Sequence, residues 1–260
     1  MLMNSMFGAL LFAGGMFLGM ILFQEVGRRI GISRKENRPE DIGIGVGAMQ
    51  AGVFALLGLL IAFTFSGAAS RFDDRRKLIA QEANAIGTAH LRLDLLPSDA
   101  RSVLRQRFSQ YLDARLAFYR KLPDIEAARE EWTRGTALQN EIWTQAITAC
   151  RAQTDPPICM LLLPALNEMI DITTTRMTAM MTHPPTIVFV LLFGLALGSS
   201  LVAGYEMSGS TRRSWTHMIM FAAMTAFTVY IILDLEYPRA GLIRVDAADQ
   251  VLLDLRESMK

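Results

Sequence analysis

Four apolar stretches, each about 20 residues long and free of charged side chains, constrain what this chain can fold into. They cover residues 3–23, 43–65, 186–205 and 215–233. An α-helix rises about 1.5 Å per residue, so roughly 20 apolar residues cross the ~30 Å hydrocarbon core of a bilayer. The sequence therefore predicts an integral membrane protein with four transmembrane helices.

The polar segment between the second and third apolar stretches has the pattern of a helical bundle. Residues 66–95 contain no proline and place apolar residues at helical spacing, so the second span is expected to leave the membrane as one continuous helix. Further helices are predicted to start near Ser98, Asp124 and Ile158. The predicted buried face of the Ser98 helix is Leu104, Phe108, Leu112, Leu116 and Tyr119, and that of the Asp124 helix begins at Ile125 and Ala128.

These patterns predict an all-α integral membrane protein with four transmembrane helices and a four-helix extramembrane bundle inserted between spans 2 and 3. The expected divisions are 1–66 for spans 1 and 2, with a basic cytosolic loop at 25–42, and 67–184 for the helical periplasmic domain. Spans 3 and 4 occupy 185–236, and a C-terminal tail occupies 237–260. Only residues 242–245 suggest a short strand.

Charge in the short loops predicts the orientation. Basic residues are concentrated in the two short loops, at Arg28, Arg29, Arg34, Lys35, Arg38, Arg212 and Arg213. Short loops rich in Lys and Arg remain cytosolic, whereas long domains translocate largely regardless of charge. The insert and both termini are therefore expected to be periplasmic, in a bacterial inner membrane. Basic residues just beyond the second span weaken this signal, at Arg71, Arg75, Arg76 and Lys77.

The two cysteines, Cys150 and Cys159, lie on either side of a predicted turn between two helices. A disulfide there would close the tip of a helical hairpin, and disulfides persist in the periplasm but not in the cytosol. The alternative is a pair of unrelated buried thiols.

Small residues form one stripe along the second span and polar residues continue it into the insert. Such a stripe suits a water path lined by copies of this helix, and it equally suits a tight helix interface followed by a solvated face. In the first interpretation, the pore-lining residues are Ala55, Gly58, Ala62, Ser66 and Ser70, and the apolar gate is Phe63 and Phe65. A hydrated vestibule would then be formed by Asn84, Asn167, Asp171 and Thr178, although such a row also suits the wet side of an amphipathic helix.

Two glycine pairs in the spans and two acids after the fourth span have structural interpretations. Gly15 with Gly19, and Gly194 with Gly198, have the spacing that allows close helix packing. Asp234 and Glu236 follow the fourth span, where they are expected to be solvated or paired with Arg239.

The sequence argues against several functional classes. A net charge of +1 gives no basic surface for nucleic acid. The three histidines are dispersed without a second ligand at metal spacing, and no P-loop, nucleophile elbow or carboxylate pair is present. We expect no metal, no cofactor and no enzymatic activity.

Several runs resemble a known family. The segment 58–74, with 82–87 and 91–97 after it, and the tail segment 234–245 are similar to a family of bacterial membrane proteins of unknown function labelled bestrophin-like. The resemblance implies kinship to bestrophins, which are pentameric anion channels with an apolar pore neck. This chain differs from them in having no acidic calcium clasp, and its loop charges place both termini outside, whereas bestrophin termini are cytosolic.

The function expected from these features is a homo-oligomeric, ion channel-like membrane protein with a pore lined by its second span. Its partners would be the lipid bilayer, copies of itself and inorganic ions. The alternative is a non-conducting membrane scaffold or a signal-transducing sensor with a periplasmic helical domain.

Overall fold

A computed structural model describes residues 6–37, 46–122, 124–152, 156–209, 214–239 and 241–259. These ranges contain helices and no strand, so the strand suggested at 242–245 is wrong. The elements are α1 (Met6–Asn37), α2 (Val46–Arg92), η3 (Leu93–Leu95), α3 (Ser98–Lys121), α4 (Ile125–Ala152), α5 (Pro156–Met181), α6 (Thr186–Met207), α7 (Trp215–Glu236), η4 (Asp246–Asp249) and α8 (Gln250–Ser258).

The chain forms two compact units. The first comprises Met1–Ser70 with His183–Leu242, and the second comprises Arg71–Thr182 with Ile243–Lys260. The continuous helix predicted from the second span through residue 92 is confirmed as α2, which contributes residues to both units. The C-terminal residues from 243 onward belong with the second unit.

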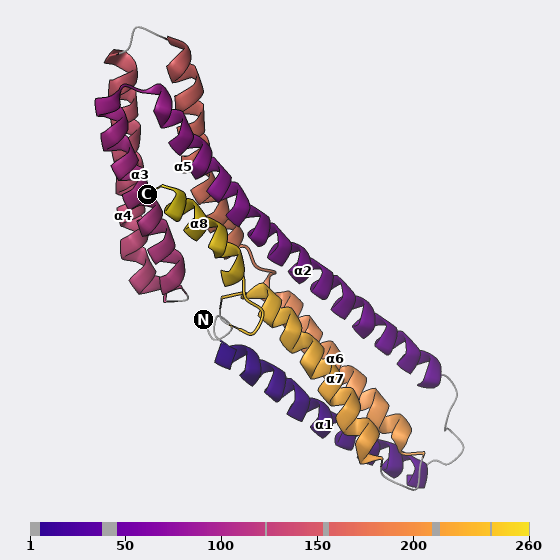
Figure 1. The fold of residues 1–260 in the computed structure, drawn as a ribbon. Helices are drawn as coiled ribbons and strands as arrows, with labels where there is room; N and C mark the ends of the chain where they lie inside the picture. The colour runs from indigo at the N-terminus through magenta and orange to yellow at the C-terminus, as the bar shows by residue number, and fades with distance from the viewer. Residues whose placement is uncertain are drawn as a thin grey trace. The chain divides into compact units, whose positions relative to one another are not determined.

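Four helical stretches are long and apolar enough to cross a membrane, at Phe7–Lys35, Gly47–Leu95, Pro157–Met207 and Trp215–Glu236. The predicted fold class, an all-α membrane protein with four such helices, is confirmed. In the first unit, α1 packs against α6 and α7 (Figure 1). Met16 and Met20 of α1 are fully buried there, as are Leu192 of α6 and Val229 of α7. The flexible methionine side chains fill the irregular space between the helices.

Glycines bring α1 and α6 into backbone contact. A methyl group on Gly27 would overlap the Leu201 carbonyl, and one on Gly204 would overlap the carbonyl of Gln24. Of the other glycines predicted to pack closely, Gly19 does, because an added methyl group would lie 3.0 Å from the Leu197 side chain of α6. The prediction is wrong for Gly15, Gly194 and Gly198, where an added methyl group would meet no atom within 4 Å. At Gly27 and Gly204, only a residue without a side chain allows the two helix backbones to approach so closely.

The first helix extends further than the hydropathy pattern indicates. It continues to Asn37, so Arg28, Arg29, Arg34 and Lys35 lie on its last turns and not in a loop. Lys35 Nζ donates a hydrogen bond to the Ser208 carbonyl at the end of α6, 3.2 Å away. The other basic residues used to predict orientation, Arg38, Arg212 and Arg213, lie outside the described residues.

The second unit is built around one hydrophobic core with contributions from α2, α3, α4, α5 and α8. All five residues predicted to be buried on α3 are buried. Ile125, predicted to face inward on α4, is 65% exposed. It is the first residue of that helix, after Asp124, whose carboxylate accepts the Ala127 N–H at 3.1 Å and caps the helix.

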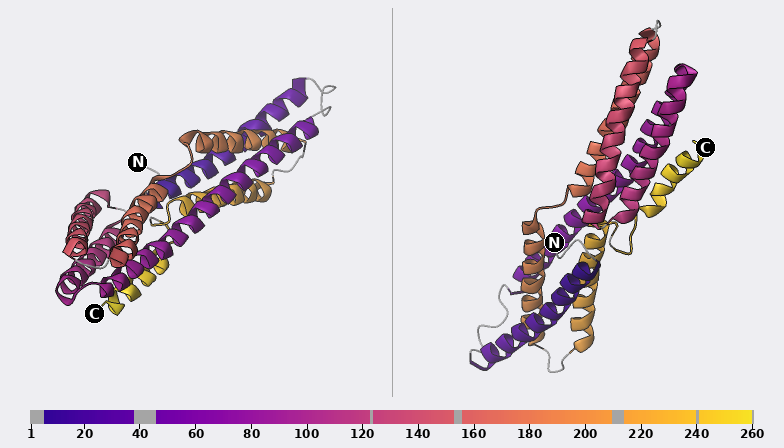
Figure 2. Two further views of the ribbon diagram at one scale, coloured as in Figure 1. Left: turned by 90° about the horizontal axis from the view of Figure 1, so that it is seen from above. Right: turned by 90° about the vertical axis from the view of Figure 1, so that its left-hand side faces the viewer.

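Helices α3 and α4 run side by side, as two further views also show (Figure 2). At the end of α4 the predicted disulfide is confirmed: Cys150 and Cys159 are bonded, with their Cα atoms 5.7 Å apart. Cys150 lies in the last turn of α4 and Cys159 in the first turn of α5, so the bridge joins the ends of the two helices.

Candidate functional site

The membrane half of α2 packs on one side only. Phe54 meets the ring of Phe221 on α7, with centroids 5.4 Å apart, and Leu57 and Ala68 on the same side are buried. The five predicted pore-lining residues lie around the rest of the helix and are all exposed: Ala55, Gly58, Ala62, Ser66 and Ser70. A methyl group added to Gly58 would meet no atom within 4 Å. No described helix of the same subunit therefore covers this face, which we call the small-residue face.

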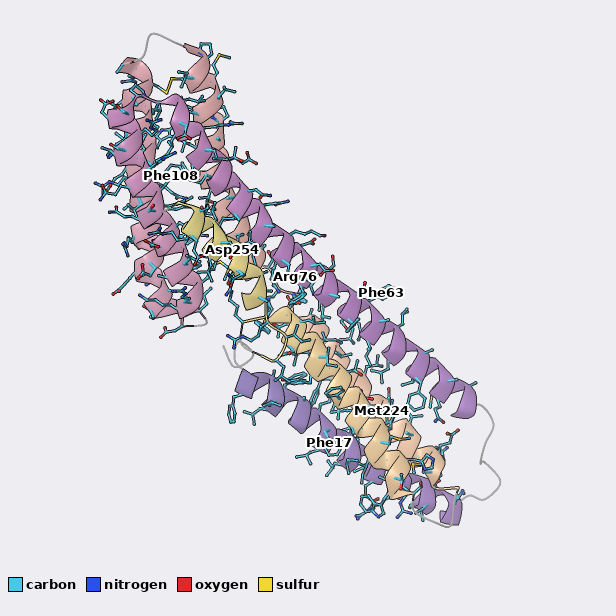
Figure 3. All side chains as sticks on the ribbon, in the orientation of Figure 1. Phe17, Phe63, Arg76, Phe108, Met224 and Asp254 are labelled. Carbon is cyan, nitrogen blue, oxygen red and sulfur yellow. A yellow bond between two sulfur atoms is a disulfide. The ribbon has the colours of Figure 1, made fainter. Side chains whose placement is uncertain are left out.

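The predicted gate residues flank the small-residue face. Phe63 and Phe65 are both exposed, and Figure 3 shows Phe63 on the surface of α2. Residues two positions apart on an α-helix point in directions about 200° apart, so the two rings project from opposite flanks of the small-residue face. They cannot both point toward one axis from the same subunit.

The small-residue face carries no charge between Gly47 and Ser70. On the half-buried side of the same segment, the Thr64 hydroxyl donates to the Leu60 carbonyl at 2.8 Å, so its polar group is satisfied within the helix. Such a surface is narrow, neutral and weakly polar. It would let water and ions approach the backbone closely without binding them tightly.

The predicted vestibule residues lie in the second unit. Asn84 on α2 and Asn167, Asp171 and Thr178 on α5 are all exposed. The Asn167 amide donates to the Asp171 carboxylate at 3.4 Å. No hydrogen bond between described residues joins Asn84 to the other three.

A buried ionic cluster lies inside the second unit, and we name it the Glu82 cluster. Glu82 of α2 is fully buried and binds two guanidinium groups, Arg115 of α3 and Arg176 of α5. Arg115 Nε lies 2.6 Å from Glu82 Oε1, and Arg176 donates to the other oxygen. Arg176 also pairs with Asp249 at 3.5 Å, and the Tyr119 hydroxyl donates to Glu82 at 3.0 Å. The cluster thus pairs two acids with two bases, and three of these side chains, all but that of Asp249, are buried.

Electrostatics hold this cluster ionised. The residues involved lie beyond residue 70, outside the apolar span of α2. Burial by itself raises the pKa of Glu82, but the adjacent Arg115 and Arg176 outweigh it and lower that pKa below 4.5. Burial raises the pKa of Tyr119 as well, so its hydroxyl remains a hydrogen-bond donor. Arg176 is also stacked over the Tyr119 ring at 3.8 Å, which adds a cation–π contact.

For the two acids at the end of α7, the sequence predicts either solvation or pairing with Arg239, and solvation is wrong. Asp234 and Glu236 are buried. Both Asp234 oxygens accept the Leu242 N–H, at 3.0 and 3.1 Å, and a side chain on Gly241 would overlap that carboxylate. Glu236 lies 3.0 Å from His183 Nδ1. Asp234 therefore holds the segment that follows α7, and Glu236 holds the segment that precedes α6, against the end of α7.

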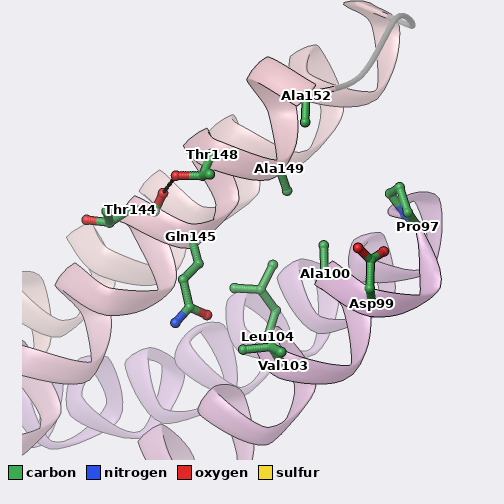
Figure 4. Close-up of a pocket in the computed structure, with 10 residues that line it drawn as sticks. All are labelled: Pro97, Asp99, Ala100, Val103, Leu104, Thr144, Gln145, Thr148, Ala149 and Ala152. Carbon is green, nitrogen blue, oxygen red and sulfur yellow. Dashed lines mark hydrogen bonds between the residues drawn. The ribbon is translucent and has the colours of Figure 1, made fainter.

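A groove of about 560 Å³ opens between the start of α3 and the end of α4. In Figure 4, Asp99 and Ala100 on α3 face Gln145 and Ala149 on α4. The Gln145 carbonyl oxygen is buried without a hydrogen-bond partner among the described residues. Within the same ranges, no three His, Cys, Asp or Glu side chains are placed to hold a metal ion.

Sequence reasoning missed the Glu82 cluster although a signal was present. Glu82 lies three residues after Ile79 and four before Ile86, which places a charge on an otherwise apolar helix face. Arg115 occupies the same kind of position between Leu112 and Tyr119. A charge at an apolar position predicts a buried partner, because an isolated buried charge is too costly.

The fold and these sites define an all-helical membrane protein with one helix face left open. A family model described as a Bestrophin-like domain matches residues 19–249. The chain therefore belongs to the Bestrophin-like family, as the resemblance predicted. No curated protein matches it.

Solved structures with a similar fold include bacterial bestrophin homologues from Klebsiella pneumoniae. A leucine-to-threonine variant aligns with a TM-score of 0.67 at 15% identity, covering 94% of this chain and 98% of that one. An aspartate-to-alanine variant gives 0.66 at 13%, covering 94% and 98%. A structure phased with zinc gives 0.62 at 14%, covering 92% and 97%. At this identity the likeness establishes the fold.

Proposed function

We propose that this protein is a homo-oligomeric, ion channel-like membrane protein whose pore is lined by the small-residue face of α2. Membership of the Bestrophin-like family and the fold shared with bacterial bestrophin homologues support a channel-like role. The observation that carries the proposal is that Ala55, Gly58 and Ala62 are exposed, so no described helix of the same subunit covers them. A helix that leaves its smallest residues uncovered within the subunit is suited to surround an axis with its copies.

In this proposal the flanking phenylalanines act in pairs across subunits. Phe63 of one subunit and Phe65 of the next would approach one another between neighbouring α2 helices and narrow the path by apolar contact. Asn84, Asn167, Asp171 and Thr178 would line a hydrated vestibule in the second unit. The protein would be a conduit and not an enzyme, with inorganic ions as its cargo.

Substituted cysteines test the lining directly, because both native cysteines are bonded to each other. Purified Ala62→Cys protein in planar bilayers should change its conductance when a charged methanethiosulfonate reagent is added. The matched control is Met224→Cys, which is exposed on α7 and should react without changing the current. Absence of any conductance in the unmodified protein over a range of salts and voltages would refute the channel.

The proposed orientation places the second unit and both termini in the periplasm of the bacterial inner membrane. The basic end of α1 and the Cys150–Cys159 bridge support it. Ser33→Cys should then be labelled only after an impermeant maleimide reaches the cytosolic side, and Thr148→Cys from the periplasmic side. Labelling of the two positions from the reverse sides would show the opposite orientation.

A non-conducting scaffold or sensor is the second candidate. One observation favours it: α2 runs unbroken from the first unit into the second, where Glu82 fixes it through the buried cluster. A rigid helix of this kind can transmit a binding event from one unit to the other. The scaffold predicts a purified protein that folds and inserts normally but never conducts.

A further inference from the structure

One side of α1 forms an apolar ridge that ends at an arginine. Leu18, Leu22, Val26 and Ile30 follow one another at intervals of four residues, and all are exposed. Arg34 occupies the next position of the same row. Because residues four apart share a helix face, the ridge runs along the helix and finishes at a cationic group.

The end of this ridge lies against a cavity of about 220 Å³ within the first unit. Ile30 and Arg34 of α1, Met49 of α2, and Leu201, Val202 and Tyr205 of α6 line it. Among the lining residues, only Arg34 and Tyr205 have polar side chains. An apolar cavity with one cationic side chain at its edge fits a molecule with an apolar body and an anionic group.

The basic side chains near Arg34 on α1 already have partners. Arg28 and Arg29 pair with Glu25, and Lys35 donates to a carbonyl at the end of α6. No carboxylate among the described residues pairs with Arg34, whose side chain is exposed. Its charge is therefore available to an external anion at the point where the apolar part of α1 ends.

We propose that this cavity binds an anionic phospholipid, which we call the Arg34 lipid site. An acyl chain lies along the ridge and enters the cavity beside Ile30 and Val202, while the phosphate contacts Arg34. Basic pockets between membrane helices favour anionic headgroups in this way. Lipid binding at this site does not require conduction, so it can be tested independently of the proposed channel function.

Native mass spectrometry of the full chain in detergent tests the site with two probes, phosphatidylglycerol and phosphatidylcholine of the same chain length. The unmodified protein should retain phosphatidylglycerol in preference to phosphatidylcholine. Arg34→Gln should weaken phosphatidylglycerol binding about fivefold, the change expected from one basic residue near a membrane surface. Arg29→Gln, five residues earlier on α1 and with a 77% exposed side chain, is the matched control and should bind as the unmodified protein does.

A second variant distinguishes the contribution of the acyl chain to binding from that of the headgroup. Met49→Trp fills the cavity from an exposed position and should weaken the binding of both lipids. Glycerol phosphate, a soluble headgroup probe, should not compete. The proposal is overturned by equal losses in Arg34→Gln and Arg29→Gln, by unchanged binding in Met49→Trp, or by competition from glycerol phosphate, which would show a site for free phosphate.

Discussion

Replacing Glu82 by glutamine should destabilise the second unit severely. The substitution preserves the shape of the side chain but removes its charge. Arg115 and Arg176, each with a side chain only 4% exposed, would then remain buried, with Asp249 as the only acid of the cluster. Glutamine can accept a hydrogen bond from one of them but cannot neutralise either.

The expected cost is about 3–5 kcal/mol, the range found when one partner of a buried ion pair is removed. It exceeds the value of an ordinary hydrogen bond, because the penalty comes from guanidinium groups left without a counter-charge. For a folded unit of this size, the loss should lower the midpoint of thermal unfolding by about 10–20 °C.

Thermal unfolding of the full chain in detergent, followed by tryptophan fluorescence, measures this effect. Trp132 is a suitable reporter because its ring lies 5.3 Å from the Arg115 guanidinium. The control is Asp73→Asn, which removes an exposed acid from the same helix and should change the midpoint by less than about 2 °C.

A triple variant distinguishes lost charge from lost shape. Replacing Glu82 by leucine and both Arg115 and Arg176 by methionine removes the three buried charges and leaves Asp249, whose side chain is 15% exposed and can be hydrated. The triple variant should therefore recover most of the lost stability. A single variant that melts like the unmodified protein would refute the reasoning. So would a triple variant as unstable as Glu82→Gln.

The pH dependence gives a further check with a defined sign. The folded pKa of Glu82 lies below its ordinary value of 4.5, so its contribution is fully present above pH 4.5 and is lost as the pH falls through the folded pKa. The midpoint difference between the unmodified protein and Glu82→Gln should therefore stay constant from neutral pH to 4.5 and shrink below it. A difference that shrinks above pH 4.5 would contradict the assignment.

Three other predictions follow from the packing. Gly204→Ala should lower the unfolding midpoint and the yield of monodisperse protein, because its methyl group meets the backbone of α1, whereas Gly194→Ala, with open space around it, should do neither. Reducing the bond between Cys150 and Cys159 should lower stability by about 2–3 kcal/mol, which a melting curve with and without dithiothreitol measures, and an unchanged curve would contradict it. Gly241→Ala should displace the buried carboxylate at the end of α7 and expose the tail to limited proteolysis, and a digestion pattern identical to that of the unmodified protein would refute this.

The elements of this fold could be predicted from its sequence because each depends on short-range patterns. Span length, proline positions and apolar spacing located the four membrane helices, the continuous α2 and the buried face of α3. The disulfide was predictable for the same reason, since Cys150 and Cys159 are close along the chain. The end of α1 could not be predicted, because polar residues can extend a membrane helix into water without any change of periodicity.

Features that depend on contacts between distant segments escaped sequence analysis. Gly27 and Gly204 lie where α1 and α6 are in close contact, whereas a methyl group added to Gly15, Gly194 or Gly198, which have the spacing typical of close helix packing, would meet no atom within 4 Å. Glu82 and Arg115 are far apart along the chain, and their pairing requires α2 and α3 to be side by side. The exposure of the small-residue face could not be predicted either, because it depends on which side of α2 the other helices occupy.

The Glu82 cluster also limits how this sequence can change over generations. Glu82 neutralises the buried Arg115 and Arg176, and Asp249, 15% exposed, also pairs with Arg176, so losing any one of the four alone leaves an uncompensated charge. Neutral drift at these positions must therefore proceed by coordinated replacement. Among relatives, the residues aligned with Glu82, Arg115 and Arg176 should be retained together or turn apolar together.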